Sequence, residues 1–257
     1  MEEKHVVIGA AGALGSAIVG VLSGLGKSVR AVVRDVDRAR RVLPPEADIV
    51  IGDGANAESV RLVCRNATVI YNCINVPFEK WYTVMPAITD NILAGAREAR
   101  ARLVFPGNVY GYGPLRMTPA NEDHPLAATS KQGQLRNELE RKLIDANLMA
   151  DVKVVIARFP EYYGPNVTNW LMSPIFQAAL DGRTAAWPGK LEVPHDLIYI
   201  HDAATACCIL GTSEASYGQV WHVPGAGPIT GKQFIGMAFE AAGTKARMKA
   251  MGRGYFR

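Results

Sequence analysis

The chain has 257 residues, 49% of them hydrophobic, and a formal net charge of +4, which allows a large buried core and argues against a nucleic-acid partner. No apolar run reaches the length of a membrane span and no signal peptide is recognisable, so we expect a cytoplasmic protein without a membrane partner. Four cysteines without ligand spacing and five scattered histidines predict reduced thiols and no metal site.

A glycine-rich turn follows the first predicted strand, which covers residues 6–8, and opens a helix. Gly9 permits the tight turn, Gly12 lets the backbone approach a pyrophosphate, and Gly15 lets the helix pack on the strand. The N–H groups of the helix point at the anion. A strand, turn and helix without a ligand is the alternative, but the pattern favours dinucleotide binding. The cofactor-binding residues expected here are Gly9, Gly12, Ala13, Leu14 and Gly15.

The second predicted strand covers residues 28–33 and is followed by Arg34. At this place the Rossmann pattern has an acid that binds the adenosine ribose or an arginine that accommodates a 2′-phosphate. A guanidinium suits a phosphate because its forked donors match the oxygens. Arg34 therefore favours NADP as the cofactor. Asp35 follows at once and keeps NAD as the alternative.

Strand and helix go on alternating as far as residue 105. Strands are expected over 48–54, 68–75 and 101–105, and helices over 58–67 and 78–100. This order predicts an α/β protein, a Rossmann-type doubly wound parallel sheet with ligands at the C-terminal edge of the strands. No linker divides the chain, so we expect residues 1–257 to form a single NAD(P)-binding domain.

Four further segments carry a resemblance to a known family. They are 105–111 (FPGNVYG), 122–126 (EDHPL), 159–165 (FPEYYGP) and 196–204 (DLIYIHDAA). With the glycine turn, their order and spacing resemble the extended short-chain dehydrogenase/reductase superfamily, the NAD-dependent epimerase/dehydratase family. The resemblance covers essentially the whole chain.

The resemblance implies further cofactor contacts. In that family an acid at the end of the third strand contacts the adenine, so Asp53 and the adjoining Gly54 are expected beside it. The end of the fourth strand, with Asn75, is expected under the nicotinamide half of the cofactor.

The resemblance also implies a Tyr-x-x-x-Lys pair, in which the lysine lowers the pKa of the phenol and the tyrosine exchanges a proton with substrate. Extension from the EDHP segment without a gap places Gln132 at the tyrosine, Arg136 at the lysine and Glu140 at a helical glutamate. A rival register uses Lys131 as the lysine and places Ala127 at the tyrosine. Either way the tyrosine is replaced, although Arg136 could still bind ribose or phosphate.

The serine or threonine of the family pattern is replaced as well, because residues 106–108 are Pro-Gly-Asn. A hydride-transferring enzyme would then use another polar group near the pocket. The candidates are Tyr110, Tyr112, Tyr162, Tyr163, Lys131 and Asn108, with packing as the alternative, above all for Tyr110 and Tyr163. The residues expected to take part in catalysis are Gln132, Arg136, Asn108, Tyr110 and Lys131.

The substrate side is expected in segments of about 160–195 and 224–257, which would form a small C-terminal substrate-binding region. The candidate substrate contacts are Trp81, which lies earlier in the chain, and Tyr163 and Trp170 of the first of these segments, with a core role as the alternative. Their rings suggest an apolar or aromatic carbonyl compound, or the face of a sugar. Residues 245–253 are expected to be a basic tail, which is usually a solvated end.

Together these observations predict an NADP(H)-binding protein that oxidises, reduces, epimerises or dehydrates a small carbonyl, hydroxyl or sugar compound. The alternative is a catalytically silent dinucleotide-binding sensor or regulatory protein, which the replaced tyrosine and lysine favour. A homodimer is left open.

Overall fold

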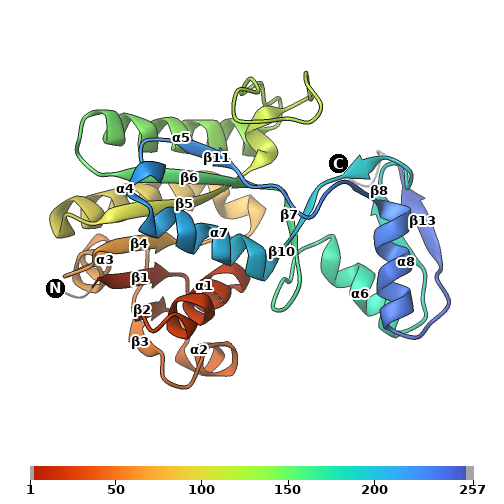
Figure 1. Cartoon of the computed structure of the whole chain (residues 1–257), viewed down its shortest axis with the longest axis horizontal. Coiled ribbons are helices and arrows are strands. Elements are labelled where there is room, and N and C mark those ends of the chain that lie inside the picture. Colours follow the sequence, from red (N-terminus) through yellow and green to blue (C-terminus); the bar gives the residue numbers. More distant parts are fainter. Residues whose placement is uncertain (1–2, 253–257) are drawn as a thin grey trace. The chain divides into compact units, whose positions relative to one another are not determined.

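The computed structural model describes residues 3–252 and divides into two compact units (Figure 1). The first unit contains the chain up to Phe159 together with Ile200–Val223. The second contains Pro160–Tyr199 and the chain from Pro224. The second unit takes in most of the two segments expected on the substrate side, whose contact with a substrate stays a prediction.

A seven-stranded sheet forms the centre of the first unit, in the order β11-β6-β5-β4-β1-β2-β3. All neighbouring strands pair in parallel. The strands are β1 (Lys4–Ile8), β2 (Ser28–Val33), β3 (Asp48–Ile51), β4 (Val69–Asn72), β5 (Arg102–Asn108), β6 (Val154–Phe159) and β11 (Val220–His222). The strand order turns back between β1 and β4, and a doubly wound sheet binds its ligand at such a switch point. The predicted Rossmann-type α/β fold is confirmed.

Helices separate the strands and cover the sheet on both faces. They are α1 (Ala13–Gly24), α2 (Val36–Val42), α3 (Ala57–Val63), α4 (Trp81–Ala99), α5 (Lys131–Leu148) and α7 (Ile200–Thr212), with short 3-10 helices η1 (Phe78–Lys80), η2 (Val109–Tyr112) and η3 (Glu214–Ser216). Helices α1 and α7 contact each other, as they do in Figure 1. Because helices cover both faces, β1 and β6 are buried along almost their whole length rather than at alternate residues, and most of their residues are apolar.

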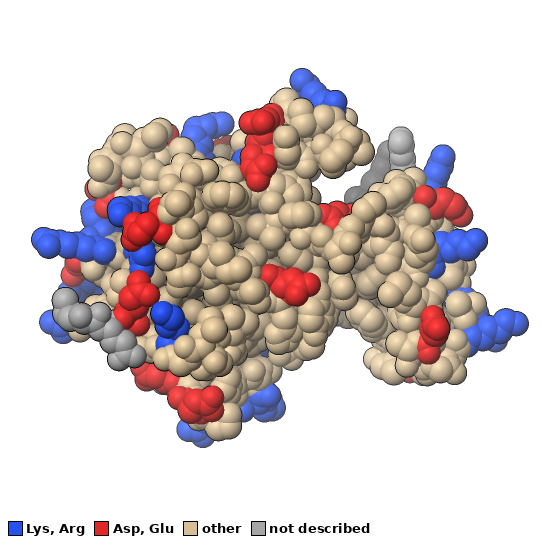
Figure 2. All heavy atoms as spheres, viewed as in Figure 1, with Lys and Arg blue, Asp and Glu red and all other residues tan. Residues whose placement is uncertain are grey.

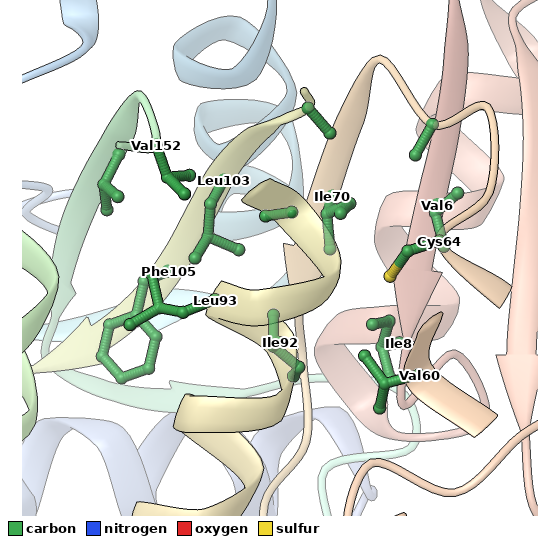
Figure 3. Close-up of a cluster of buried hydrophobic side chains, with 14 of the residues drawn as sticks. Val6, Ile8, Val60, Cys64, Ile70, Ile92, Leu93, Leu103, Phe105 and Val152 are labelled. Carbon is green, nitrogen blue, oxygen red and sulfur yellow. The ribbon is translucent and has the colours of Figure 1, made fainter. Parts of the chain in front are cut away.

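A large core cluster lies between the sheet and helices α3, α4 and α5. Figure 3 shows Val6 and Ile8 from β1 together with Ile92 from α4 and Phe105 from β5. Each of these four side chains is at most 2% exposed. Burial of one such side chain stabilises the fold by about 1.5–3 kcal/mol.

The strand expected over 101–105 is longer in the structure. β5 continues through Pro106, Gly107 and Asn108 because these residues pair with Ala157–Phe159 of β6. The replaced serine/threonine segment is therefore part of the sheet edge. An ideal Cβ on Gly107 would lie 3.1 Å from Glu140 Oε1, so glycine lets α5 approach the strand closely.

The second unit packs two helices with short strands around its own core. Its elements are β7 (Glu161–Tyr163), α6 (Met172–Leu180), β8 (Ala185–Pro188), β9 (Pro194–His195), β10 (Leu197–Tyr199), β12 (Ile229–Thr230), α8 (Gly231–Ala241) and β13 (Met248–Met251). Trp187 is the largest buried side chain of this core, at 1% exposure.

The expectation of a solvated basic tail is wrong for residues 248–251. These residues form β13, which pairs in parallel with β8, and Met248 packs against the second core. Lys249 stays exposed between the two half-buried methionines, so a basic composition is compatible with an edge strand. Arg253, the last residue of the expected tail, lies outside the described residues.

Within residues 3–252, no helix is both long and apolar enough to cross a membrane. Basic and acidic side chains are interspersed over the face in Figure 2, without a block of one sign. No group of three or more histidine, cysteine or acidic side chains in the described part of the chain could hold a metal ion.

Candidate cofactor and substrate site

Two glycines of the β1–α1 turn are required by the fold itself. Gly9 has a φ of +87°, and an ideal Cβ there would lie 2.8 Å from the carbonyl oxygen of Cys73. A Cβ on Gly15 would overlap the Gly9 carbonyl oxygen and lie 2.9 Å from the Cα of Ala10. These positions explain the tight turn and the close packing of helix on strand.

Gly12 differs from the other two glycines of the turn. Its φ of −79° is open to any residue, and an ideal Cβ would contact only the Gly9 carbonyl oxygen, at 3.3 Å. The fold therefore requires glycine less strictly at this position than at Gly9 or Gly15, and close approach of a ligand is the stronger reason for it. Gly12 is also the N-cap of α1, which has no side-chain cap and no acidic residue in its first turn. With Ala13 and Leu14 as its first residues, this helix start fits the pyrophosphate of a dinucleotide.

Arg34 is exposed directly after β2, where the sequence placed it. Asp35 is the N-cap of α2, and its Oδ1 accepts a hydrogen bond from the Arg38 backbone N–H at 2.9 Å. The carboxylate that could serve an adenosine ribose is thus already engaged in capping a helix.

The turn after β3 is held by its own hydrogen bonds. Asp53 Oδ1 accepts from the Ala55 N–H at 3.0 Å, and the Asp53 N–H donates to Ser59 Oγ at 2.9 Å. The Gly54 carbonyl accepts from Asn91 Nδ2 of α4 at 3.0 Å. Gly54 is buried, with Ile74 occupying the space of a Cβ. Asp53 is exposed at the sheet edge and open to an adenine.

Asn75 is exposed in the loop after β4, and its Oδ1 accepts from the Val76 N–H at 3.1 Å. This local bond shapes the loop that leads into η1. The four cofactor segments, at Gly12, Arg34, Asp53 and Asn75, follow β1, β2, β3 and β4, so one sheet edge brings them together.

Trp81 and Arg136 form the centre of an aromatic cluster near the ends of β4 and β5. The indole is 2% exposed, and its Nε1 donates to the Val76 carbonyl at 2.8 Å. The Arg136 guanidinium carbon lies 4.4 Å above the Trp81 ring and 5.8 Å from the Phe105 ring. Such a cation–π contact contributes about 2 kcal/mol when it is desolvated. Trp81 is thus packed beneath an arginine, and its contact with substrate stays a prediction.

Asn108 and Tyr110 lie beside this cluster. Asn108 caps η2, because its Oδ1 accepts from the Tyr110 N–H at 3.1 Å. The Tyr110 ring lies 6.3 Å from the Trp81 ring at an interplanar angle of 26°. Tyr110 is half-buried, which is compatible with both of the expected roles, proton donor and packing residue.

The start of α5 is fixed against η2. Ser130 Oγ accepts from the Gly133 N–H at 3.1 Å, and a Cβ on Gly133 would overlap the Tyr110 carbonyl oxygen. Gly133 therefore lets the helix touch η2. Lys131, the first residue of α5, is exposed, and Gln132 is half-buried. Gln132 and Arg136 lie one turn apart on this helix, as their spacing predicts.

The sequence analysis did not predict the ion pair that joins α5 to β6. Arg158 of β6 donates to Glu140 Oε2 from Nε at 3.0 Å and from Nη2 at 2.7 Å. Burial raises the pKa of the Glu140 carboxyl, while Arg158 and the charge of Arg136 oppose that rise. The Arg158 guanidinium carbon also lies 5.1 Å from the Tyr112 ring. The sequence feature that could have predicted this ion pair is Arg158 itself, which directly precedes the FPEYYGP segment.

The two remaining substrate candidates lie in the second unit. Tyr163 of β7 packs on the second core, with its ring 5.5 Å from Tyr199 and 5.6 Å from Phe234. Trp170 is 46% exposed at the start of the segment that leads into α6. The packing of Tyr163 and the exposure of Trp170 leave their contact with substrate a prediction.

A family model and a named relative both match this chain. The model of the "NAD dependent epimerase/dehydratase family" matches residues 5–223. A 3-diazoavenalumate denitrifying reductase from a Streptomyces species is 28% identical in an alignment 244 residues long, and the match covers 83% of this chain and 73% of that protein.

Solved structures of epimerases have the same fold. UDP-N-acetylglucosamine 4-epimerase from Bacillus cereus superposes with a TM-score of 0.83 at 15% identity, over 98% of this chain and 86% of that one. UDP-glucose 4-epimerase from Thermus thermophilus, solved in complex with NAD, gives 0.81 at 20% identity, over 96% and 85% of the two chains. Since the family model spans most of its length, the chain belongs to the NAD-dependent epimerase/dehydratase family.

Proposed function

We propose that this protein binds NADP(H) and reduces a small electrophilic compound by hydride transfer. The observation that carries the proposal is Gly12, which the fold requires less strictly than Gly9 or Gly15 and which close approach of a pyrophosphate would require. When bound, the dinucleotide supplies the hydride. The chain's own part is to hold the pyrophosphate at the start of α1 and the adenosine half beside β2 and β3.

The preference for NADP(H) over NAD(H) rests on Arg34 and Asp35. Arg34 is exposed and stands where a 2′-phosphate is accommodated in the Rossmann pattern. Asp35 accepts a hydrogen bond at Oδ1 as the cap of α2, so one of the two carboxylate oxygens already has a partner. NAD(H) is the alternative cofactor.

Reduction is favoured over epimerisation or dehydration by the residues at the expected catalytic pair. A route that begins by oxidising a hydroxyl group needs a base that removes the hydroxyl proton. At neutral pH neither the amide of Gln132 nor the guanidinium of Arg136 can accept that proton. The name of the Streptomyces relative, a reductase, points in the same direction.

Nucleotide binding and turnover test the proposal together. NADPH and NADH are titrated into the full chain to compare their affinities. Oxidation of the nucleotide that binds more tightly is then followed in the presence of a panel of small carbonyl and conjugated compounds. We expect tighter binding of NADPH and oxidation that depends on an added compound. If neither NADPH nor NADH binds, the proposal is wrong.

A silent dinucleotide-binding sensor is the second candidate, favoured by Gln132 and Arg136 at the expected tyrosine and lysine positions. Tight NADPH binding without oxidation of the nucleotide by any compound in the panel would support the sensor. Oxidation above the rate of the free nucleotide would support the reductase.

A further inference from the structure

The segment between η2 and α5, residues 113–130, carries one inward-pointing histidine in an exposed stretch (Figure 1). This is His124 of the EDHPL motif, to which the candidate site assigns no role. His124 is 2% exposed, whereas Asp123 and Pro125 on either side of it are exposed. Its ring lies 4.9 Å from the ring of Tyr112 in η2, so this side chain ties the segment to η2.

Both ring nitrogens of His124 have backbone partners. The Arg116 N–H donates to Nε2 at 2.9 Å, and Nδ1 lies 2.9 Å from the Pro125 carbonyl oxygen. A carbonyl only accepts and a backbone N–H only donates, so these partners place the single ring proton on Nδ1. The ring is therefore neutral while the segment is closed. A second proton, on Nε2, would face the Arg116 N–H, donor against donor, and would break that bond.

The base of the segment is closed without His124. The Ala127 N–H donates to the Tyr112 carbonyl at 3.3 Å, and a Cβ on Gly113 would overlap the Ala127 carbonyl oxygen. At the start of α5, Ser130 Oγ accepts from the Gly133 N–H at 3.1 Å. Backbone amides and a serine hydroxyl do not titrate near neutral pH. Loss of the His124 bonds therefore leaves the start of α5 in place.

Charged and titratable groups from several elements surround the contact of His124 with Tyr112. They are Tyr112 of η2, Arg158 of β6, Glu140 of α5, His222 of β11, and Arg116, Glu122 and Asp123 of the segment itself.

The two glutamates of this set already have partners. Glu140 is paired with Arg158, and Glu122 Oε1 accepts from the His222 N–H at 2.6 Å. A glutamate titrates near pH 4.3, well below a histidine, so the Glu122 contact persists while histidines take up protons. Release of His124 therefore concerns residues 114–121, between the closed base and Glu122.

We propose that His124 is a pH-sensitive latch, which holds residues 114–121 closed when it is neutral and releases them when it is protonated. An exposed histidine has a pKa of about 6.5, so proton uptake favours the open segment below that pH. The open fraction, while small, should rise about tenfold for each pH unit below about 6.5. Opening uncovers Tyr112, whose ring is 5.1 Å from the guanidinium carbon of Arg158. The latch thereby connects pH to the ion pair that joins β6 to α5.

The position of the ring proton is the first test. Nitrogen chemical shifts of isotope-labelled histidine distinguish a ring protonated at Nδ1, at Nε2 or at both. The His124 signals are those that disappear in His124→Gln. We expect a neutral ring with its proton on Nδ1 at neutral pH. A proton on Nε2 at neutral pH would overturn the inference.

Hydrogen exchange of the Arg116 amide reports on the latch itself, because this N–H makes the bond to Nε2. The exchange rate is measured by NMR at neutral pH and at about pH 5.5, relative to the rate of an unprotected amide at the same pH. We expect the protection of Arg116 to fall about tenfold on acidification. The Gly133 amide, bonded to the Ser130 hydroxyl, is the internal control and should keep its protection. Unchanged protection of Arg116, or equal losses at Arg116 and Gly133, would overturn the inference.

Two variants separate His124 from its neighbours. His124→Gln keeps an acceptor for the Arg116 N–H and has no titratable ring, so the amide should stay protected at both pH values. His124→Phe keeps a ring against Tyr112 but has no acceptor, so protection should be low at both. A loss on acidification in His124→Gln as large as in the unchanged protein would assign the effect to another group, such as His222, and overturn the inference. These measurements use no nucleotide, so their outcome is independent of the proposed function.

Discussion

Arg158 and Glu140 join β6 to α5 through two hydrogen bonds that end on one carboxylate oxygen, at 3.0 and 2.7 Å. The Arg158 side chain is 6% exposed and the Glu140 side chain 4%. Because α5 carries Gln132 and Arg136 within the two turns before Glu140, this pair sets how that helix lies against the sheet edge.

Glu140→Gln should destabilise the protein by about 3–5 kcal/mol, because it leaves Arg158 as a buried charge without its carboxylate. Urea unfolding measures the loss. The double change Glu140→Gln with Arg158→Met should recover part of it, since the buried charge is then gone. Glu58→Gln is the matched control on α3, where the pair with Arg61 is exposed and screened by solvent, so the loss should be much smaller. Equal losses at Glu140 and Glu58 would contradict this account.

The sequence predicted the alternation of strands and helices because their signals are local. Apolar runs, the glycine turn and caps such as Asp35 act within a few residues. β13 escaped prediction, since the basic composition around Lys249 says nothing of a partner strand more than 60 residues earlier in the chain.

In the candidate site, too, the features set by local spacing could be predicted, and the contacts between distant elements could not. The glycine turn was predicted from spacing, and the structure separates Gly12 from the two glycines that the fold requires. Glu140 was placed by a motif, but its partner Arg158 lies on a different element. The stacking of Arg136 on Trp81 depends on the packing of α5 against α4, which no local pattern encodes.

Gly12→Val should abolish binding of NADPH and NADH while the melting temperature stays close to that of the unchanged protein. A side chain there would enter the space expected for the pyrophosphate, and its Cβ would lie 3.3 Å from the Gly9 carbonyl oxygen. Gly20→Val, on the same helix and with open space around its Cβ, is the control that should bind normally. Gly15→Val should lower both binding and melting temperature. Normal nucleotide binding by Gly12→Val would show that the turn is purely structural.

Arg34→Ala should remove most of the preference for NADPH and leave the affinity for NADH little changed. A charge-assisted contact with a phosphate contributes roughly 1.5–3 kcal/mol, which is about tenfold to a hundredfold in affinity. Fluorescence titration of both nucleotides measures the change. Arg41→Ala, at an exposed arginine in the last turn of α2, is the control that should keep the preference. Equal affinities in the unchanged protein would refute the assignment to NADP(H).

His5 makes the stability depend on pH. It is fully buried, with Nδ1 3.2 Å from the Tyr71 hydroxyl and Nε2 3.9 Å from Glu3 Oε2. Burial lowers the pKa of His5, the charge of Glu3 opposes this, and the charges of Lys27 and Arg102 reinforce it. In the unfolded chain its pKa is about 6.5.

The unfolded state therefore takes up a proton at a pH where the native state does not. As the pH falls below about 6.5, the free energy of unfolding should fall by about 1.4 kcal/mol per pH unit until the native pKa is reached. Urea unfolding of the unchanged protein and of His5→Asn, at neutral pH and at about pH 5.5, measures this contribution. We expect His5→Asn to lose less stability on acidification. A loss equal to that of the unchanged protein would assign the pH dependence to other groups.

Gln132 and Arg136 give the sharpest test of the catalytic side. Gln132→Ala should leave native turnover within a few-fold, because an amide contributes no proton. Gln132→Tyr together with Arg136→Lys should create or raise reduction of a saturated carbonyl compound, since the phenol and the ammonium restore the general acid that usually contributes about 10²–10⁴ in rate. Rates of NADPH oxidation with matched saturated and conjugated ketones measure both effects.

Gln132→Tyr alone is the control, since the phenol then lacks the lysine that lowers its pKa and should gain less. A large loss of turnover in Gln132→Ala would mean that the glutamine orients the substrate by hydrogen bonding. Gln132 would then have a role in catalysis, contrary to the prediction. Turnover that survives Gln132→Ala would instead identify an enzyme whose proton, where one is needed, comes from another group, with Tyr110 and Lys131 as the next residues to change.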